Sequence, residues 1–326
     1  MLRVSDDPLC HTKFVLTTVV PHSRCRKSSH SITTSSNEVF MASPALKASI
    51  EAREFIVAPG VYDLISALMA DRMGFKALYV TGYGTVASAL GLPDAGLATY
   101  TEMIDRIGCI CRMTKTPVIA DADTGYGGLL NVRHTVRGYE AAGVSAIQIE
   151  DQEFPKKCGH TPNRRVVPMA DMVRKIKVAS DSRSSRDFLI VARTDARTSL
   201  GLDEALRRGE AYAEAGADIV FIESPETEAE MIDIGRRIRT PLVANMVNGG
   251  RTPMLPAKRL AEIGYSLAIF PAAGFLATAK ALDEAYSDLR DNGTTTKPDT
   301  MFSFAEFNKL IGFEDVWAFE RRYAES

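Results

Sequence analysis

A cysteine set among basic residues is the clearest candidate for chemistry in this chain. Cys158 follows Lys156 and Lys157 and lies two positions before His160, in a segment bordered by proline and glycine. Nearby cations lower the pKa of a thiol from its free value of about 8.5, whereas structural cysteines usually lie in apolar surroundings. The segment therefore indicates a reactive loop, although the same residues would also suit a solvated charged loop.

Composition limits the classes of function. The chain has 326 residues, of which 45% are apolar and 25% charged, as in an ordinary globular protein. The net charge of −2 gives no electrostatic reason to expect a nucleic acid or an anionic membrane as partner. No stretch reaches the ~20 apolar residues of a membrane helix. The five cysteines lack paired metal-ligand spacing, so we expect a reducing compartment and a cytoplasmic location.

Residues 1–44 differ from the rest of the chain. The segment is rich in serine and threonine and has no clear periodicity. It could be a transit-like segment, but Asp6, Asp7 and Glu38 do not fit the acid-poor composition of such segments. We favour a disordered extension that precedes a natural start at Met41, and we expect no chemistry from it.

A repeating pattern begins at residue 45. A polar, alanine-rich helical stretch ends in glycine, the usual residue after a helix, and a short apolar run of the kind found in buried parallel strands follows. The predicted strands are 55–58, 77–80, 117–120, 146–149, 188–192, 219–222, 241–244 and 267–270. Eight such units predict an α/β fold, a (β/α)8 TIM barrel over residues 45–290. A doubly wound open sheet is the alternative, but no GxGxxG motif follows the first strand.

The pattern changes after residue 290. Residues 291–298 have the composition of a linker, and Phe302 to Phe319 form an aromatic, amphipathic helical segment. Within residues 291–326 we therefore expect an extra C-terminal helix that packs on another surface, such as a neighbouring subunit.

Polar residues follow the predicted strands at the ends where a barrel gathers its active site. Asp121 and Asp123 lie two apart at the end of the third strand, so their side chains should extend from one strand in the same direction, and Glu150 follows the fourth strand. These like charges would repel one another, and carboxylates with no histidine or cysteine nearby favour Mg²⁺ or Mn²⁺. Alternatively, the acids could pair with Arg193 and lysines in a structural network. Arg193 also suits a bidentate grip on a substrate carboxylate.

Four motifs together resemble one family. They are Asp-Ala-Asp-Thr-Gly-Tyr-Gly at 121–127, Ile-Glu-Asp-Gln at 149–152, Lys-Lys-Cys-Gly-His at 156–160 and Ala-Arg-Thr-Asp-Ala at 192–196. The chain is similar to the isocitrate lyase/phosphoenolpyruvate mutase superfamily over roughly residues 45–290. The Cys-Gly-His loop resembles the branch that cleaves carbon–carbon bonds and differs from the phosphonate branch, which generally lacks the cysteine.

Within that branch the chain resembles the compact members, which include 2-methylisocitrate lyase, 2,3-dimethylmalate lyase and oxaloacetate hydrolases. Residues 80–84 and 245–253 look most like 2,3-dimethylmalate lyase, and Tyr83 would narrow the pocket where methylisocitrate lyases have glycine. Pro271 stands where oxaloacetate hydrolases tend to carry serine. The resemblance implies a metal-dependent lyase acting on an alkylated malate. The alternatives are oxaloacetate hydrolysis, a phosphonopyruvate- or phosphoenolpyruvate-type mutase reaction and, in another class, a non-catalytic dicarboxylate-binding protein.

The resemblance also implies roles for individual residues. Mg²⁺ (or Mn²⁺) would be held mainly by Asp123, with Asp94, Asp121 and Glu150 acting partly through waters. Cys158, on a mobile lid with His160, would protonate the carbanion, and Tyr79 or Lys156 would act as the base. The expected substrate-binding residues are Thr81, Gly82, Tyr83, Arg193, Glu223, Asn245, Thr252 and Pro271. The family implies a small dicarboxylate substrate and a homotetramer in which the C-terminal helix swaps between subunits.

Overall fold

The computed structural model describes residues 42–159, 161 and 163–324. The predicted extension lies almost wholly outside the described residues, as does His160, so those predictions remain untested. The first described helix, α1, begins at Pro44, with the Ser43 side chain accepting a hydrogen bond from the Ala45 amide.

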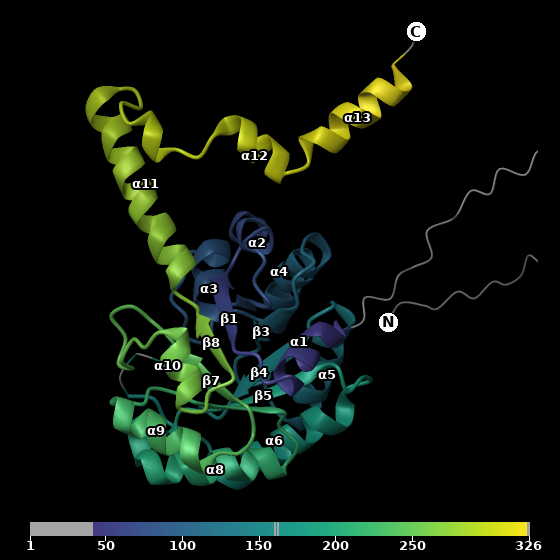
Figure 1. Ribbon diagram of the computed structural model, residues 1–326. Coiled ribbons are helices and arrows are strands. Elements are labelled where there is room, and N and C mark those ends of the chain that lie inside the picture. Colours follow the sequence, from purple (N-terminus) through teal and green to yellow (C-terminus); the bar gives the residue numbers. More distant parts are fainter. Residues whose placement is uncertain (1–41, 160, 162, 325–326) are drawn as a thin grey trace, which may run out of the picture. The chain divides into compact units, whose positions relative to one another are not determined.

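Eight parallel strands form a closed barrel, as the repeating pattern predicts. The strands are β1 (Ile56–Val61), β2 (Leu78–Val80), β3 (Val118–Asp121), β4 (Ala146–Glu150), β5 (Leu189–Thr194), β6 (Ile219–Ile222), β7 (Leu242–Asn245) and β8 (Leu267–Phe270). Each strand pairs with the next along the chain, and β8 pairs with β1 through the register Ile56 to Leu267. The strands lie at the centre and the helices around them (Figure 1). The open-sheet alternative is therefore wrong.

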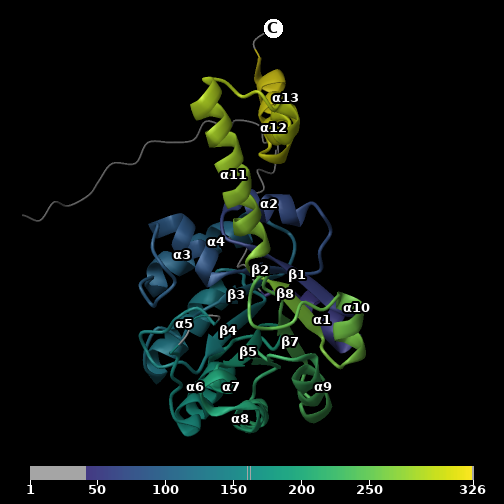
Figure 2. The same cartoon turned by 90° about the vertical axis from the view of Figure 1, so that its left-hand side faces the viewer.

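Helices connect the strands, and Figure 2 shows them around the barrel from a second direction. The connecting helices are α2 (Leu64–Asp71), α3 (Gly82–Leu90), α4 (Tyr100–Met113), α5 (Leu129–Ala141), α6 (Met169–Ser182), α7 (Ala196–Leu200), α8 (Leu202–Glu214), α9 (Glu228–Arg237) and α10 (Ala257–Glu262). Helix α1 (Pro44–Glu51) precedes β1, whereas α11 (Ala273–Asn292) follows β8 and extends away from the barrel. Side chains of the preceding residue cap several of the helices; Thr99, for example, forms a capping box with Glu102 at the start of α4.

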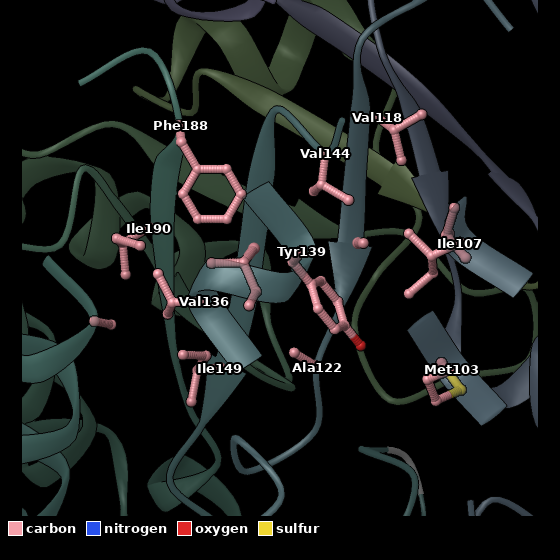
Figure 3. Close-up of a cluster of buried hydrophobic side chains, with 14 of the residues drawn as sticks. Met103, Ile107, Val118, Ala122, Val136, Tyr139, Val144, Ile149, Phe188 and Ile190 are labelled. Atoms are coloured by element: carbon pink, nitrogen blue, oxygen red, sulfur yellow. The ribbon is translucent and has the colours of Figure 1, made fainter. Parts of the chain in front are cut away.

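Alternation along the strands divides the core into two layers. Leu189 and Val191 of β5 belong to the cluster that fills the barrel, while Ile190 and Ala192 belong to the cluster under the helices. This is the inside–outside pattern of a barrel strand. Figure 3 shows part of the outer layer, in which Tyr139 of α5 lies among apolar side chains. The packed layers fix the strand ends, and therefore the groups that follow them.

The chain after α11 differs from the prediction. Instead of one helix it contains a short 3₁₀ turn, η1 (Pro298–Thr300), and two helices, α12 (Phe304–Leu310) and α13 (Phe313–Tyr323). Gly312 separates the helices with a φ of 90°, a left-handed conformation that ends a helix. Neither α12 nor α13 has a buried residue, and Phe304, Phe319 and Tyr323 are largely exposed.

No helix among the described residues is long and apolar enough to cross a membrane.

Candidate active site

A cavity of about 300 Å³ lies where the strands end. Both polar or charged groups and apolar or aromatic groups line it. The polar lining comprises Tyr79, Thr81, Asp94, Asp121, Lys156, Lys157, Cys158, Gly159, Thr161, Arg193, Glu223 and Asn245. The apolar and aromatic lining comprises Tyr83, Val247, Ile269, Pro271, Ala272, Phe275 and Leu276. Its size suits a small organic acid.

Three carboxylates and one lysine form what we call the acidic cluster: Asp94, Asp121, Asp123 and Lys156. The Nζ atom of Lys156 lies 2.5 Å from Oδ1 of Asp94 and 2.7 Å from Oδ1 of Asp123. All four residues are buried, and the lysine is 2% exposed. The predicted alternative was that the acids pair with Arg193 and lysines. Such pairs are present, since Lys156 pairs with Asp94 and Asp123, and Arg193 pairs with Glu150 at 3.2 Å.

A turn, rather than strand alternation, brings Asp121 and Asp123 together. Strand β3 ends at Asp121, and Asp123 has a φ of 48°, so the expectation that both side chains extend from one strand is wrong. The Asp123 amide donates to Oδ1 of Asp121 at 3.0 Å, and the Glu150 amide donates to the Asp123 carbonyl at 2.9 Å. The Tyr139 hydroxyl also donates to the Asp121 carbonyl at 3.2 Å. These bonds hold the less favourable left-handed conformation of Asp123.

Burial acts strongly on these acids. It raises the pKa of Asp123 to about 7, and the neighbouring charges of Asp121 and Asp94 add to the effect while Lys156 opposes it. Burial likewise raises the pKa of Glu150 well above its ordinary value, despite Arg193 beside it. The single lysine does not balance the three carboxylates, so the acidic cluster lacks positive charge.

The donor set suits a hard divalent cation. Among the described residues no three acidic, histidine or cysteine side chains converge as a formed metal site. However, Oε1 of Glu150 is buried with no hydrogen-bond partner in the described part of the chain. An ion held by Asp94, Asp121, Asp123 and Glu150 would satisfy that oxygen, and Lys156 would then have to leave Asp94 and Asp123.

Both residues expected as the base are protonated in this arrangement. Burial, then Asp121, raises the pKa of Tyr79 well above 10, and its hydroxyl donates to Oε1 of Gln148 at 3.2 Å. Burial lowers the pKa of Lys156, but Asp123 and Asp94 outweigh it and raise that pKa well above its ordinary value. As placed here, each group is a proton donor rather than an acceptor.

The Cys158 loop, which we define as residues 152–167 with 160 and 162 outside the description, contributes Lys156, Lys157, Cys158, Gly159 and Thr161 to the cavity lining. The Cys158 amide donates to the Asp94 carbonyl at 3.2 Å, and the Ser224 hydroxyl lies 3.1 Å from the Gly159 carbonyl oxygen. A Cβ atom on Gly159 would overlap Arg193 and come within 2.8 Å of the Glu223 carboxyl carbon. Only glycine lets the backbone approach so closely.

Carboxylates surround Arg193. Its Nε and Nη2 atoms donate to the two oxygens of Asp195, each at 2.9 Å. Oε2 of Glu150 lies 3.2 Å away, and Oε2 of Glu223 lies 3.5 Å away. Glu223 in turn accepts from the Asn245 side chain at 3.0 Å. These contacts fix the guanidinium at the cavity wall, where it can meet an anionic substrate.

A second buried arginine was not predicted. Arg164, from the Cys158 loop, pairs with Asp195 and donates to Oγ1 of Thr198 at 2.6 Å. We call Arg164, Arg193 and Asp195 the arginine cluster. Burial raises the pKa of Asp195, but Arg193 and Arg164 outweigh it and hold that pKa below its ordinary value. The Ala-Arg-Thr-Asp-Ala motif contained Asp195, whereas Arg164 gave no sequence signal beyond a basic residue in a charged loop.

The apolar wall was also missed apart from two residues. Tyr83 stacks on Phe275 of α11 with ring centroids 5.2 Å apart, and Leu276 lies beside them in the cavity lining. Pro271, which was predicted, is part of the same wall. The sequence gives no signal for Phe275 and Leu276, because they lie within a helix whose facing depends on the closed barrel.

Most predicted site residues reach the cavity. Gly82, Asp123, Glu150 and Thr252 do not line it. Gly82 begins α3, and a Cβ there would come within 2.7 Å of Asp121. Thr252 is buried, with no hydrogen-bond partner for its hydroxyl among the described residues.

Comparisons with known proteins agree with this geometry. A family model described as phosphoenolpyruvate phosphomutase matches residues 46–290. A 2,3-dimethylmalate lyase of Eubacterium barkeri is 51% identical over 276 residues, which cover 84% of this chain and 96% of that protein. A 2-methylisocitrate lyase of Aeropyrum pernix is 44% identical, covering 86% and 89%.

Solved structures are similar as well. An oxaloacetate acetylhydrolase bound to the inhibitor 3,3-difluorooxalacetate superposes with a TM-score of 0.84 at 33% identity, covering 89% of this chain and 99% of that one. The predicted family resemblance is thus confirmed. The chain belongs to the phosphoenolpyruvate phosphomutase family, within the isocitrate lyase/phosphoenolpyruvate mutase superfamily, and is a lyase.

Proposed function

We propose that this protein cleaves an alkylated malate, a 2-hydroxy dicarboxylate, into pyruvate and a second carboxylate, with Mg²⁺ (or Mn²⁺) as cofactor. The observation that carries the proposal is the mixed lining of the cavity, in which charged groups and apolar side chains occur together with Cys158. Two carboxylates and an alkyl group on one small molecule match such a lining. The 51% identical relative is a 2,3-dimethylmalate lyase, which supports the same substrate class.

The polar wall would bind the end of the substrate that becomes the keto acid. Arg193 presents a fixed guanidinium to that carboxylate. Helix α3 begins at Gly82 with no side-chain cap, so its first amides are available as further donors. Glu223 and Asn245 would shape the other end of the site.

The apolar wall would hold the alkyl substituents. Tyr83, Phe275 and Leu276 supply an apolar surface to the cavity, in which the rings of Tyr83 and Phe275 stack. A longer tricarboxylate would have to bury an additional carboxylate against this wall, and burying an unpaired charge is costly. We therefore favour a malate with small alkyl groups over methylisocitrate.

The acidic cluster and Glu150 would hold the cation. When bound, Mg²⁺ supplies Lewis-acid stabilisation of the negative charge that develops on the substrate oxygens.

Cleavage converts the C2 hydroxyl into the keto group of pyruvate. The hydroxyl loses its proton, the C2–C3 bond breaks, and its electron pair remains on C3 as an aci-carboxylate. Cys158 would then donate the thiol proton to C3, which gives the second carboxylate. The hydroxyl proton would pass to Lys156 once this lysine has left Asp94 and Asp123, because burial lowers its pKa and those two carboxylates would no longer raise it. Tyr79 would remain a proton donor, since burial raises its pKa.

The closed Cys158 loop would keep water away from the carbanion. The loop lines part of the cavity, and contacts from Asp94 and Ser224 hold it there. Exclusion of water prevents premature protonation and strengthens the electrostatic contacts inside. The loop would have to open for the substrate to enter and for the products to leave.

Oxaloacetate hydrolysis is the second candidate. The structural likeness to an oxaloacetate acetylhydrolase favours it. Pro271 in the apolar wall disfavours it, because proline has no side-chain hydroxyl with which to bind a hydrated keto group. We therefore place this activity second.

We also propose a homotetramer in which α12 and α13 pack on a neighbouring subunit, in a reducing compartment such as the cytoplasm. The exposed aromatic residues of α12 and α13 support the assembly, since large exposed apolar patches mark interaction surfaces. None of the three described cysteines, Cys109, Cys111 and Cys158, forms a disulfide in the described part of the chain, which suits such a compartment.

The test is a substrate panel with Mg²⁺. The purified protein is incubated with 2,3-dimethylmalate, methylisocitrate and oxaloacetate, beside Cys158→Ala. Pyruvate from dimethylmalate, lost in the variant, is the expected result. Acetate and oxalate from oxaloacetate, without cleavage of dimethylmalate, would favour the second candidate. Undiminished turnover in Cys158→Ala would overturn the role of the thiol.

A further inference from the structure

The Cys158 loop carries a cation that does not reach the cavity wall. The side chain of Arg164 is fully buried, although its neighbour Arg165 is 78% exposed and pairs with Glu153 at the surface. Each of its three nitrogen atoms has a partner. Nε donates to the Thr161 carbonyl at 3.2 Å, Nη2 to Thr198 at 2.6 Å, and Nη1 to Asp195.

Asp195 is the point at which the two arginines meet. Its Oδ1 atom accepts from Nη1 of Arg164 and from Nη2 of Arg193, while Oδ2 accepts from Nε of Arg193. Its backbone amide donates to Asp151 at 2.9 Å, which anchors the main chain in the core. The carboxylate is thus held on one side by the loop and on the other side by the arginine of the cavity.

We propose that Arg164 is a positioning residue, which couples closure of the Cys158 loop to the orientation of Arg193. For its effect on catalysis this inference rests on the proposed function. The coupling itself is a property of the protein without substrate.

The competing contacts of Arg193 give the coupling its physical basis. Asp195 holds the guanidinium in a bidentate pair, but Glu150 and Glu223 lie close enough to attract it elsewhere. With Arg164 in place, Asp195 is fixed and its pair with Arg193 defines one orientation. Opening the loop withdraws Arg164, so that Asp195 gains rotational freedom and Arg193 is no longer held in one place.

The coupling must be reciprocal. If a closed loop favours one orientation of Arg193, that orientation favours the closed loop by the same factor. An enzyme built in this way aligns its substrate-binding arginine only when Cys158 is also in place. Arg164 would thus link two events that must coincide, although it touches neither substrate nor thiol.

The first experiment needs no substrate. In the full-length protein, the rate at which iodoacetamide alkylates Cys158 is followed by peptide mass spectrometry. We expect Arg164→Met to raise this rate by about tenfold or more, because the loss of one partner of a buried pair is strongly unfavourable. Arg165→Met is the matched control and should leave the rate unchanged. An unchanged rate in Arg164→Met would overturn the link to loop closure.

A double-mutant cycle tests the link to Arg193. Alkylation is measured in Arg164→Met, in Arg193→Lys and in the double variant. We expect Arg164→Met to raise the alkylation rate of Cys158 much less in the Arg193→Lys background than in the unaltered protein. If the rate change in the double variant equals the product of the two single rate changes to within about twofold, the two residues act independently and the coupling is overturned.

Arg164→Lys guards against loss of the fold. Lysine keeps the charge but cannot serve Asp195, Thr198 and Thr161 together, so an intermediate alkylation rate is expected. If Arg164→Met does not fold, the double-mutant cycle is run with Arg164→Lys in its place. A rate equal to that of the unaltered protein would show that the fork of donors has no role and would overturn the proposal.

Turnover provides a readout that a purely structural role would not give. We expect Arg164→Met to raise KM for dimethylmalate about tenfold through Arg193, with a smaller fall in kcat, and to leave KM almost unchanged in the Arg193→Lys background. An equal rise in KM in the unaltered and Arg193→Lys backgrounds would overturn the positioning role. If the unaltered protein cleaves nothing, the proposed function fails, but the alkylation cycle still decides the coupling.

Discussion

The acidic cluster and the arginine cluster lie on neighbouring parts of the same barrel mouth but treat their charges in opposite ways. In the acidic cluster one lysine faces three carboxylates, and burial raises the pKa of Asp123 to about 7. In the arginine cluster two guanidinium groups share one carboxylate, and the pKa of Asp195 is held below its ordinary value.

The difference separates two uses of buried charge. A carboxylate whose ionised form is disfavoured gains from any cation that arrives, so the acidic cluster is suited to bind one. A carboxylate already matched by two arginines gains nothing more, and its contribution is to fix geometry. The comparison predicts that substitutions in the arginine cluster will mainly lower stability, whereas substitutions in the acidic cluster will mainly lower turnover.

The largest effect on stability is expected from Asp195→Asn. The substitution leaves Arg164 and Arg193 without their shared counter-charge, and breaking a buried pair costs about 3–5 kcal/mol. Urea unfolding at neutral pH measures the change. Asp171→Asn, which breaks an exposed pair with Arg174, is the control and should cost less than about 1 kcal/mol. A similar small loss in both variants would erase the distinction between the clusters.

Asp123→Asn should behave in the opposite way. We expect turnover to fall about a thousandfold, because several kcal/mol of transition-state stabilisation depend on a bound cation. The free energy of unfolding should change much less, since the native fold already disfavours the charged form of this side chain. Keto-acid release and urea unfolding are measured together, with the exposed Glu153→Gln as control. A loss of stability as large as that of Asp195→Asn would contradict this assignment.

Magnesium should stabilise one cluster only. A cation that binds the native state raises the free energy of unfolding by about 2.7 kcal/mol at a hundred times its Kd. Thermal unfolding with Mg²⁺ and then with a chelator measures this shift and its reversal. We expect it in the unaltered protein and in Arg165→Met, but not in Asp123→Asn. A shift that persists in Asp123→Asn would place the ion elsewhere.

The smallest expected effect concerns acid pH. Because the folded pKa of Asp195 lies below the unfolded one, its contribution to stability is complete above the ordinary value of 3.8 and is lost as the pH falls through the folded pKa. The difference in unfolding free energy between the unaltered protein and Asp195→Asn should therefore narrow as the pH falls below about 4. Urea titrations at a series of pH values measure it. A difference that widens in acid would show that the pKa is raised instead.

Local sequence was sufficient to predict the barrel. Each predicted strand overlaps an observed one, because a parallel strand buried on both faces must be a short apolar run whatever its neighbours are. The same reasoning placed Asp121 at the mouth, since strand ends share one edge, whereas the family resemblance supplied the roles of Glu223 and Asn245. It did not predict the break in the C-terminal helix, because the amphipathic pattern continues across Gly312.

Contacts between distant segments could not be predicted from local sequence. The pair of Lys156 with Asp94 joins residues 62 positions apart, and that of Arg164 with Asp195 joins residues 31 apart. Both basic residues lie in a charged loop, where a solvated position is the usual outcome. Only the closed position of the Cys158 loop at the cavity buries them, and closure depends on the tertiary structure.

The close approach of Gly159 to Arg193 and Glu223 has a consequence for the evolution of this site. Any substitution at position 159 adds at least one carbon atom, and that atom would come within 2.8 Å of the Glu223 carboxyl group. A side chain at this position would force Arg193 and Glu223, which lie 3.5 Å apart in the buried site, to move together. Mutational searches for altered specificity should therefore be directed at Tyr83, Phe275 and Leu276, which line the cavity away from this contact.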